Sequence, residues 1–190
     1  MNKSVTALLG ASALAAAAQA DSAIAADAPY PSRPIRLISP FTPGGGNDIV
    51  SRALALAVSG NIGATIVVDN RPGANTIVGM ELAAKAAPDG YTLIMTSSTQ
   101  AINATLYPKL PYDSIKSFAP VSLVGSSPLI LVAPIASSIR TVAELIAAAK
   151  AKPGELTYPS AGTGNATHLG GELFAAMAGI KLTHVPYKGS

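Results

Sequence analysis

Short runs of aliphatic and β-branched residues alternate with segments in which apolar residues recur at three- and four-residue spacing. The runs lie at 35–38, 65–68 and 91–95. Between them, apolar residues follow helical spacing over 47–58 and again over 78–86. Residues that favour turns separate each run from the next. This part of the chain therefore predicts the order strand, helix, strand, helix, strand.

The pattern changes after residue 95. A polar stretch over 96–103 and a proline-rich stretch over 107–112 interrupt the alternation. Two apolar runs follow at 121–124 and 129–133, separated by Gly-Ser-Ser-Pro. We therefore expect two α/β units, with the change between them near residues 97–120.

The second unit contains a capping box, Thr141-Val142-Ala143-Glu144, which predicts the start of a helix. A strand over 156–158, a helix through 169–177 closed by Gly179, and a strand over 182–185 follow. Strands that alternate with helices favour parallel sheets covered by helices. The predicted fold class is α/β.

Two glycine-rich loops share one design. Each follows a predicted strand and opens a predicted helix, the first at 40–48, with Asn47 as the expected cap, and the second at 160–168. A helix N-terminus offers unpaired N–H groups and a partial positive charge, and glycine lets a ligand approach the backbone. The loops therefore predict a site for a small organic anion. The expected ligand-binding residues are Thr42, Pro43, Gly44, Gly45, Gly46, Asn47, Asp48, Thr96, Ser97, Ser98, Thr99, Ser160, Ala161, Gly162, Thr163, Gly164, Asn165, Thr167 and His168.

Composition narrows the classes of protein. The formal charge of +3 is spread thinly, and the aromatic residues are three Phe and six Tyr, so the clustered cations and stacking platforms of a nucleic-acid binder are missing. There is no cysteine for a disulfide or a thiolate metal site. Neither loop carries Gly-x-Gly-x-x-Gly or Gly-Lys-Ser/Thr, which argues against a nucleotide site. The sequence predicts no metal, cofactor or catalytic residue.

The first 26 residues resemble a signal peptide. Lys3 precedes an uncharged run from Val5 to Ala18, and small-x-small patterns place cleavage after Ala20 or near Ala25/Ala26. The alternative is a buried alanine-rich helix. The apolar run is shorter than the roughly 20 residues of a membrane span. We expect an exported, periplasmic protein.

A hydrolase or transferase using the same cleft is the alternative function. It would need Ser160 activated by His168, eight residues further along the chain. No third, orienting acid is evident. His184 lies in an apolar strand and is expected to be structural. Asp48, in the first turn of a helix, fits a role in stabilising the helix dipole as well as a ligand contact.

A series of motifs resembles the Bug-type periplasmic receptors, which are the substrate-binding proteins of tripartite tricarboxylate transporters. The motifs, in chain order, are Tyr30-Pro31-Ser32-Arg33-Pro34-Ile35, Pro40-Phe41-x-Pro43-Gly44-Gly45 with Asp48, Asn70-Arg71-Pro72-Gly73-Ala74, Ala87-Pro88-Asp89-Gly90-Tyr91-Thr92-Leu93, Leu110-Pro111-Tyr112-Asp113, Phe118-Ala119-Pro120-Val121, Ser160-Ala161-Gly162-x-Gly164 with His168-Leu169, and His184-Val185-Pro186-Tyr187-Lys188-Gly189.

The resemblance implies a two-lobed periplasmic-binding-protein architecture of the type II, Venus-flytrap kind. It implies a monomer when complete, which captures a small carboxylate and delivers it to the membrane subunits of a transporter. The first lobe would begin with 27–100, and 101–190 would form an incomplete second lobe. Because such receptors continue well beyond the Val-Pro-Tyr-Lys-Gly motif, the chain is expected to be C-terminally truncated. Residues 27–190 expressed alone are then expected to be poorly soluble and to bind carboxylates weakly.

Overall fold

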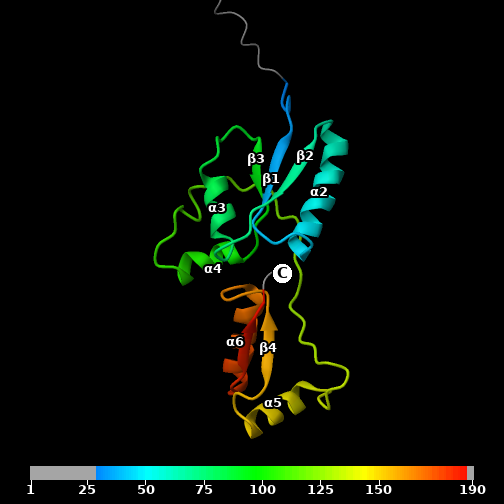
Figure 1. Ribbon diagram of the computed structural model, residues 1–190, viewed down its shortest axis with the longest axis vertical. Coiled ribbons are helices and arrows are strands. Elements are labelled where there is room, and N and C mark those ends of the chain that lie inside the picture. Colours follow the sequence, from blue (N-terminus) through cyan, green and yellow to red (C-terminus); the bar gives the residue numbers. More distant parts are fainter. Residues whose placement is uncertain (1–28, 188–190) are drawn as a thin grey trace, which may run out of the picture. The chain divides into compact units, whose positions relative to one another are not determined.

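The computed structural model describes residues 29–187, so the predicted signal peptide lies outside the described residues. Two separate parallel sheets form in this part of the chain (Figure 1). The strands are β1 (Ile35–Ser39), β2 (Ile66–Asn70), β3 (Thr92–Ile94), β4 (Thr157–Ser160) and β5 (Thr183–Pro186). The helices are α2 (Gly46–Ile62), α3 (Ile77–Ala84), α4 (Thr99–Leu106), α5 (Val142–Ala151) and α6 (Ala166–Ala178). The predicted α/β class is confirmed.

The first sheet has the strand order β2-β1-β3, and both pairings are parallel. Ile35 pairs with Ile66, and Arg36 pairs with Thr92. The central strand β1 is almost wholly buried, since α2 packs on β2 and β1 while α3 packs on β3 and β1. Figure 1 shows the strands between these two helices. Ile38 and Met80 are fully buried at the centre of this core.

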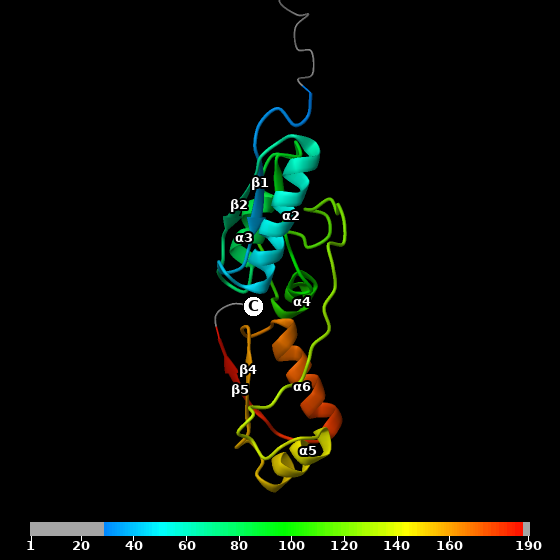
Figure 2. The ribbon, with the colours of Figure 1, turned by 90° about the vertical axis from the view of Figure 1, so that its right-hand side faces the viewer.

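The second sheet pairs β4 with β5, and α5 and α6 accompany it (Figure 2). Its core consists of Ala149, Ala175 and Ile180, against which Leu156 and Phe174 pack. The predicted capping box is confirmed, because the Thr141 side chain accepts from the Glu144 N–H and the Glu144 side chain accepts from the Thr141 N–H. Gly179 ends α6 in the left-handed conformation, as predicted.

Two sequence expectations were wrong. The polar stretch expected to interrupt the alternation of strands and helices instead contains α4. Its buried residues Thr99 and Asn103 are polar and form hydrogen bonds. The N-cap of α2 is Gly45, not Asn47, which lies within the first turn of the helix. Gly45 adopts an extended conformation there and makes no side-chain cap, and the side chain of Asp48 bonds to a neighbouring N–H instead.

The connection over 119–136 is exposed along its whole length and has no regular secondary structure. It includes both apolar runs, and the exposed fractions of Leu123, Val132 and Ile135 are 84%, 81% and 95%. No Asp, Glu, Lys or Arg occurs from 117 to 139. Among residues 29–187, no helix combines the length and apolar character needed to cross a membrane.

Candidate functional site

The predicted site residues of the first sheet lie at the carboxyl ends of β1 and β3. Loop 40–45 follows β1, and loop 95–98 follows β3. The Met95 N–H donates to the Ile38 carbonyl at 2.9 Å, which ties the two strand ends together. In the strand order β2-β1-β3, the chain passes from β1 to β2 on one side of β1 and then crosses to β3 on its other side. Ligands of open parallel sheets bind at such a topological switch point.

In the second sheet, loop 161–165 follows β4 and leads into α6. The Tyr187 N–H donates to the Ser160 carbonyl at 2.9 Å, so the carboxyl ends of β4 and β5 lie side by side. The predicted site residues differ in exposure. Pro43, Gly44, Gly46, Ser98 and Thr163 are exposed; Asp48, Thr99, Ser160 and Gly164 are buried; and Thr42, Gly45, Asn47, Thr96, Ser97, Ala161, Gly162, Asn165, Thr167 and His168 are half-buried.

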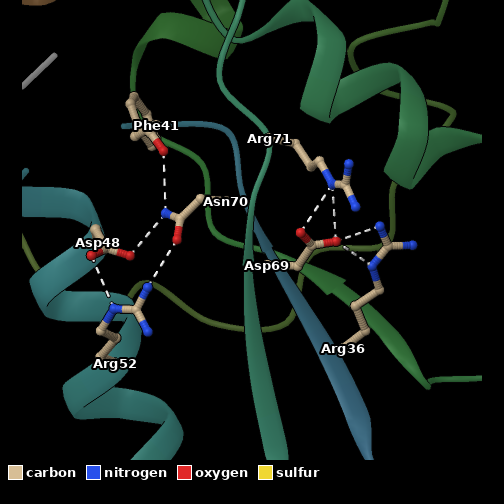
Figure 3. Close-up of polar contacts among 7 residues, drawn as sticks. All are labelled: Arg36, Phe41, Asp48, Arg52, Asp69, Asn70 and Arg71. Carbon is tan, nitrogen blue, oxygen red and sulfur yellow. Dashed lines mark hydrogen bonds and ion pairs between the residues drawn. The ribbon is translucent and has the colours of Figure 1, made fainter. Parts of the chain in front are cut away.

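Asp48 fixes the shape of the first loop. Its carboxylate accepts the Gly44 N–H at 2.9 Å, Arg52 Nε at 3.0 Å and Asn70 Nδ2 at 2.8 Å. Asn70 also donates to the Phe41 carbonyl at 3.2 Å, which joins the end of β2 to the loop (Figure 3). The Asp48 residue is only 3% exposed. These contacts hold the loop in place. A direct contact between Asp48 and a ligand stays a prediction.

The same contacts set the charge state of Asp48. The hydrogen bonds from Arg52, from the Gly44 N–H and from Asn70 lower the pKa of Asp48 from 3.8 to about 2, although burial opposes the shift. The carboxylate is therefore ionised at neutral pH. It lies in the first turn of α2, where a negative charge stabilises the helix dipole.

Side-chain hydrogen bonds within 96–99 shape the loop that follows β3. Ser97 Oγ lies 3.1 Å from Thr99 Oγ1 and accepts the Thr99 N–H at 3.3 Å. Thr99 is 1% exposed. Its buried hydroxyl supports the turn that opens α4, whereas Ser98 is exposed.

Asn103 is a supporting residue that the sequence reasoning missed. It is fully buried, donates to the Asn75 carbonyl at 2.7 Å and accepts Asn75 Nδ2 at 2.7 Å. Three consecutive residues there, Ala74, Asn75 and Thr76, have positive φ. Residues other than glycine rarely adopt positive φ, so the hydrogen bonds of Asn103 help to hold a strained turn. The motif Asn-Arg-Pro-Gly-Ala, quoted above, was the available signal for this turn.

The loop after β4 is held by its own side chains. Asn165 caps α6 by accepting the Thr167 N–H, and Thr167 Oγ1 accepts the Ala161 N–H at 3.0 Å. His168 Nδ1 accepts the Gly164 N–H at 3.2 Å. Gly162 and Gly164 have φ of 130° and 78°. Only glycine adopts such angles without strain, so the shape of this loop depends on glycine at both positions.

The pairing of Ser160 with His168 that the alternative enzyme would need does not form in the structure. Ser160 Oγ lies 2.6 Å from His184 Nε2, whereas His168 bonds to the Gly164 N–H. His184, which the sequence analysis assigned a structural role, thus contacts a predicted ligand-binding residue. The motif His-Val-Pro-Tyr was its only signal. Among the described residues, no carboxylate hydrogen-bonds to His184, so this arrangement has no third member of a catalytic triad.

A second polar cluster lies on the edge strand β2. Arg36 Nε and Arg71 Nε donate to Asp69 at 2.8 Å and 2.9 Å (Figure 3). Burial alone would raise the pKa of Asp69, but the two guanidinium groups outweigh it and lower the pKa. A cavity of about 350 Å³ lies beside this cluster and touches none of the predicted loops. A second cavity of about 370 Å³ lies along α4 and includes Ser97.

The parallel sheets and their end loops define a periplasmic-binding-protein class of receptor, and comparison with known proteins supports this. MatC from Rhodopseudomonas palustris, solved with bound malate, is 29% identical with a TM-score of 0.75, covering 84% of this chain and 55% of MatC. R. palustris Rpa4515, solved with adipate, is 33% identical with a TM-score of 0.70, covering 84% of this chain and 54% of its own.

Residues 50–190 match the family described as tripartite tricarboxylate transporter family receptor. Protein BugT of Bordetella pertussis is 41% identical over 163 residues, which are 85% of this chain and 50% of BugT. The chain belongs to this receptor family, as the resemblance of its motifs predicted. It spans about half the length of the curated relatives it matches.

Proposed function

We propose that the protein is a periplasmic receptor that captures a small carboxylate without transforming it. The observation that carries the proposal is the placement of glycine-rich loops at the carboxyl ends of parallel strands in both sheets. Each loop leads into a helix N-terminus, where N–H groups and the helix dipole favour an anion. The related structures named above contain malate and adipate, which are both dicarboxylates.

The ligand would be held by neutral side chains and by those backbone N–H groups of the loops that are not already used in bonds within the loops. The first loop would contribute Thr42 to Asn47, the turn before α4 would contribute Thr96 to Thr99, and the second loop would contribute Ser160 to His168. Asp48 would act from behind the first loop, because its carboxylate is occupied by Gly44, Arg52 and Asn70. A ligand that contacts both loops would favour a closed arrangement through its higher affinity for that state.

Delivery is the second part of the proposal. Membership of the receptor family supports membrane subunits of a tripartite transporter as the partner. The apolar N-terminal run with its small-x-small cleavage pattern supports export to the periplasm.

Calorimetry on the full-length protein tests the function, with malate, adipate and a neutral sugar as the probes. We expect micromolar binding of at least one dicarboxylate and no binding of the sugar. Binding of the sugar alone would contradict the anion site. Turnover of the bound compound, followed by mass spectrometry, would contradict simple capture.

A matched pair of glycine variants locates the site. Gly162→Ala and Gly154→Ala both put a side chain at positive φ, and at each position the added Cβ meets its nearest neighbour at ordinary distance, 3.6 Å and 3.9 Å. Alanine is disfavoured more strongly at the φ of Gly162, 130°, than at that of Gly154, 82°, so the affinities are compared under conditions where circular dichroism shows both variants to be folded. Only Gly162 lies in the ligand loop, so we expect Gly162→Ala alone to weaken dicarboxylate binding by about tenfold or more. Equal affinities in the two variants would contradict the assignment of this loop.

A further inference from the structure

A network of polar side chains lies directly behind the loop of the second sheet. The rings of His168 on α6 and His184 on β5 stack with centroids 4.0 Å apart and an interplanar angle of 29°. Tyr158 on β4 lies on the same cluster, with its ring centroid 5.1 Å from that of His184. Tyr158 donates to Glu172 Oε1 at 2.6 Å, and His168 Nε2 lies 3.8 Å from the same oxygen.

Each imidazole is joined to the ligand loop at a different atom. His184 Nε2 contacts Ser160 Oγ, which in turn accepts the Gly162 N–H at 3.1 Å and lies 3.2 Å from the Gly162 carbonyl. His168 Nδ1 accepts the Gly164 N–H. The orientation of two N–H groups of the loop thus depends on the two rings.

The two rings cannot exchange roles when a proton is added. His168 must keep Nδ1 unprotonated to accept the Gly164 N–H, whereas His184 can donate from Nε2 to Ser160 as readily as it can accept. When His184 donates, the Ser160 hydroxyl is directed to the Gly162 carbonyl instead. Two positive charges at this separation repel, so a proton on either ring opposes a proton on the other. A proton on His168 Nδ1 would break the bond to the Gly164 N–H, whereas the His184–Ser160 bond survives protonation of His184.

The groups facing His184 are His168 and Glu172 from α6 and Tyr158 from β4. Burial, and then the charge of His168, lower the pKa of His184, while Glu172 opposes the shift. His184 is accordingly neutral at pH 7 in the empty protein. A carboxylate placed on the loop would add a negative charge and favour the protonated ring.

We propose that His184 is a positioning residue of the ligand loop, which fixes the Ser160 hydroxyl and takes up a proton when a carboxylate occupies the loop. The proposal rests on the proposed function for its second half only. The first half concerns the empty protein and is tested without a ligand.

The ligand-free test is NMR titration of the His168 and His184 ring signals in the full-length protein. His168→Phe keeps a stacked ring that cannot become positively charged, so we expect the pKa of His184 to rise in this variant. The Gly162 amide should titrate together with His184 in the native protein and should lose that response in Ser160→Ala. Ser138→Ala, an exposed serine outside the loop, is the matched control and should leave it unchanged. A Gly162 amide that does not respond to His184 overturns the positioning role, and an unchanged His184 pKa in His168→Phe overturns the coupling between the two rings.

The ligand test is calorimetry of malate binding at pH 7 in two buffers with different heats of ionisation. We expect proton uptake in the native protein, a loss of affinity of about tenfold in His184→Ala, and partial recovery in His184→Gln, which still donates to Ser160 but takes up no proton. Binding without proton uptake overturns the second half of the proposal. If neither malate nor adipate binds, the proposed function fails together with that half, and the ring titration still decides the positioning role.

Discussion

At the residue scale, the side chains of the two loops mostly hold the loops themselves. Asp48 bonds to Gly44 in the first loop, and His168 bonds to Gly164 in the second. In both places a titratable side chain on the first turn of a helix accepts an N–H of the glycine-rich segment four residues earlier. The loops are therefore preorganised, and preorganisation reduces the entropy that a ligand would otherwise lose in ordering them.

Asp48→Asn tests this role for the first loop. The folded pKa of Asp48, about 2, lies below its ordinary 3.8, so the stabilisation by the carboxylate is present above pH 3.8 and is lost as the pH falls toward 2. We expect the variant to melt about 5 °C below the native protein at pH 7. The difference should shrink between pH 4 and pH 2 in thermal unfolding followed by circular dichroism.

Glu155→Gln is the control, because Glu155 forms only an exposed ion pair with Lys152. It should change the melting temperature little at either pH. A pH-independent deficit in Asp48→Asn would show that the loss comes from shape and not from charge.

Residue-level prediction from the sequence succeeded where the chemistry was local. The capping box over 141–144 and the αL glycine at 179 follow from neighbouring residues, and the structure confirms both. The Ser160–His184 contact joins residues 24 positions apart, and the register of β4 against β5 creates it. One sequence without its pairing register could not reveal that contact, so only the nearer His168 was considered as a partner of Ser160.

At the element scale, prediction from the pattern of polar residues failed where buried side chains form hydrogen bonds instead of apolar contacts. The helix α4 buries Thr99 and Asn103, two residues of the polar stretch that was expected to interrupt the alternation. The strands of the first sheet were easier to predict because the central strand β1 is almost wholly buried and contains the aliphatic residues Ile35, Leu37 and Ile38. Edge strand β2 extends to Asn70, two residues further than the predicted apolar run.

Thr141→Ala measures what the capping box contributes to α5. Loss of an N-cap side chain costs about 1 kcal/mol of unfolding free energy. Because the bonds of Thr141 and Glu144 are reciprocal, we expect the double variant with Glu144→Ala to lose less than the sum of the single losses in denaturant unfolding. Thr105→Ala, at an exposed position within α4, should change stability by less than about 0.5 kcal/mol. Additive losses would contradict the reciprocal cap.

At the scale of the whole molecule, the dominant feature is the exposed apolar connection over 119–136. Its β-branched and aliphatic residues have the composition of strands, and no strand of the described residues pairs with them. Exposed segments of this kind with low charge favour association between chains.

We therefore expect residues 27–190, expressed alone, to associate with increasing concentration. The paired change Ile130→Lys and Leu131→Ser should reduce the association by adding charge and polarity to the run at 129–133. Ile115→Lys changes an equally exposed residue outside the connection and should have a much smaller effect. Light scattering at several concentrations provides the measurement. A monomer that is insensitive to concentration would show that the connection is not adhesive.

The central claim is that one small carboxylate meets both glycine-rich loops, and amide chemical-shift mapping of the full-length protein tests it most directly. With malate or adipate, we predict the largest shifts at Gly44 to Asn47 and at Ala161 to His168, and small shifts in α5 and β2. Shifts confined to one loop, or centred on the Arg36–Asp69–Arg71 cluster, would contradict the account.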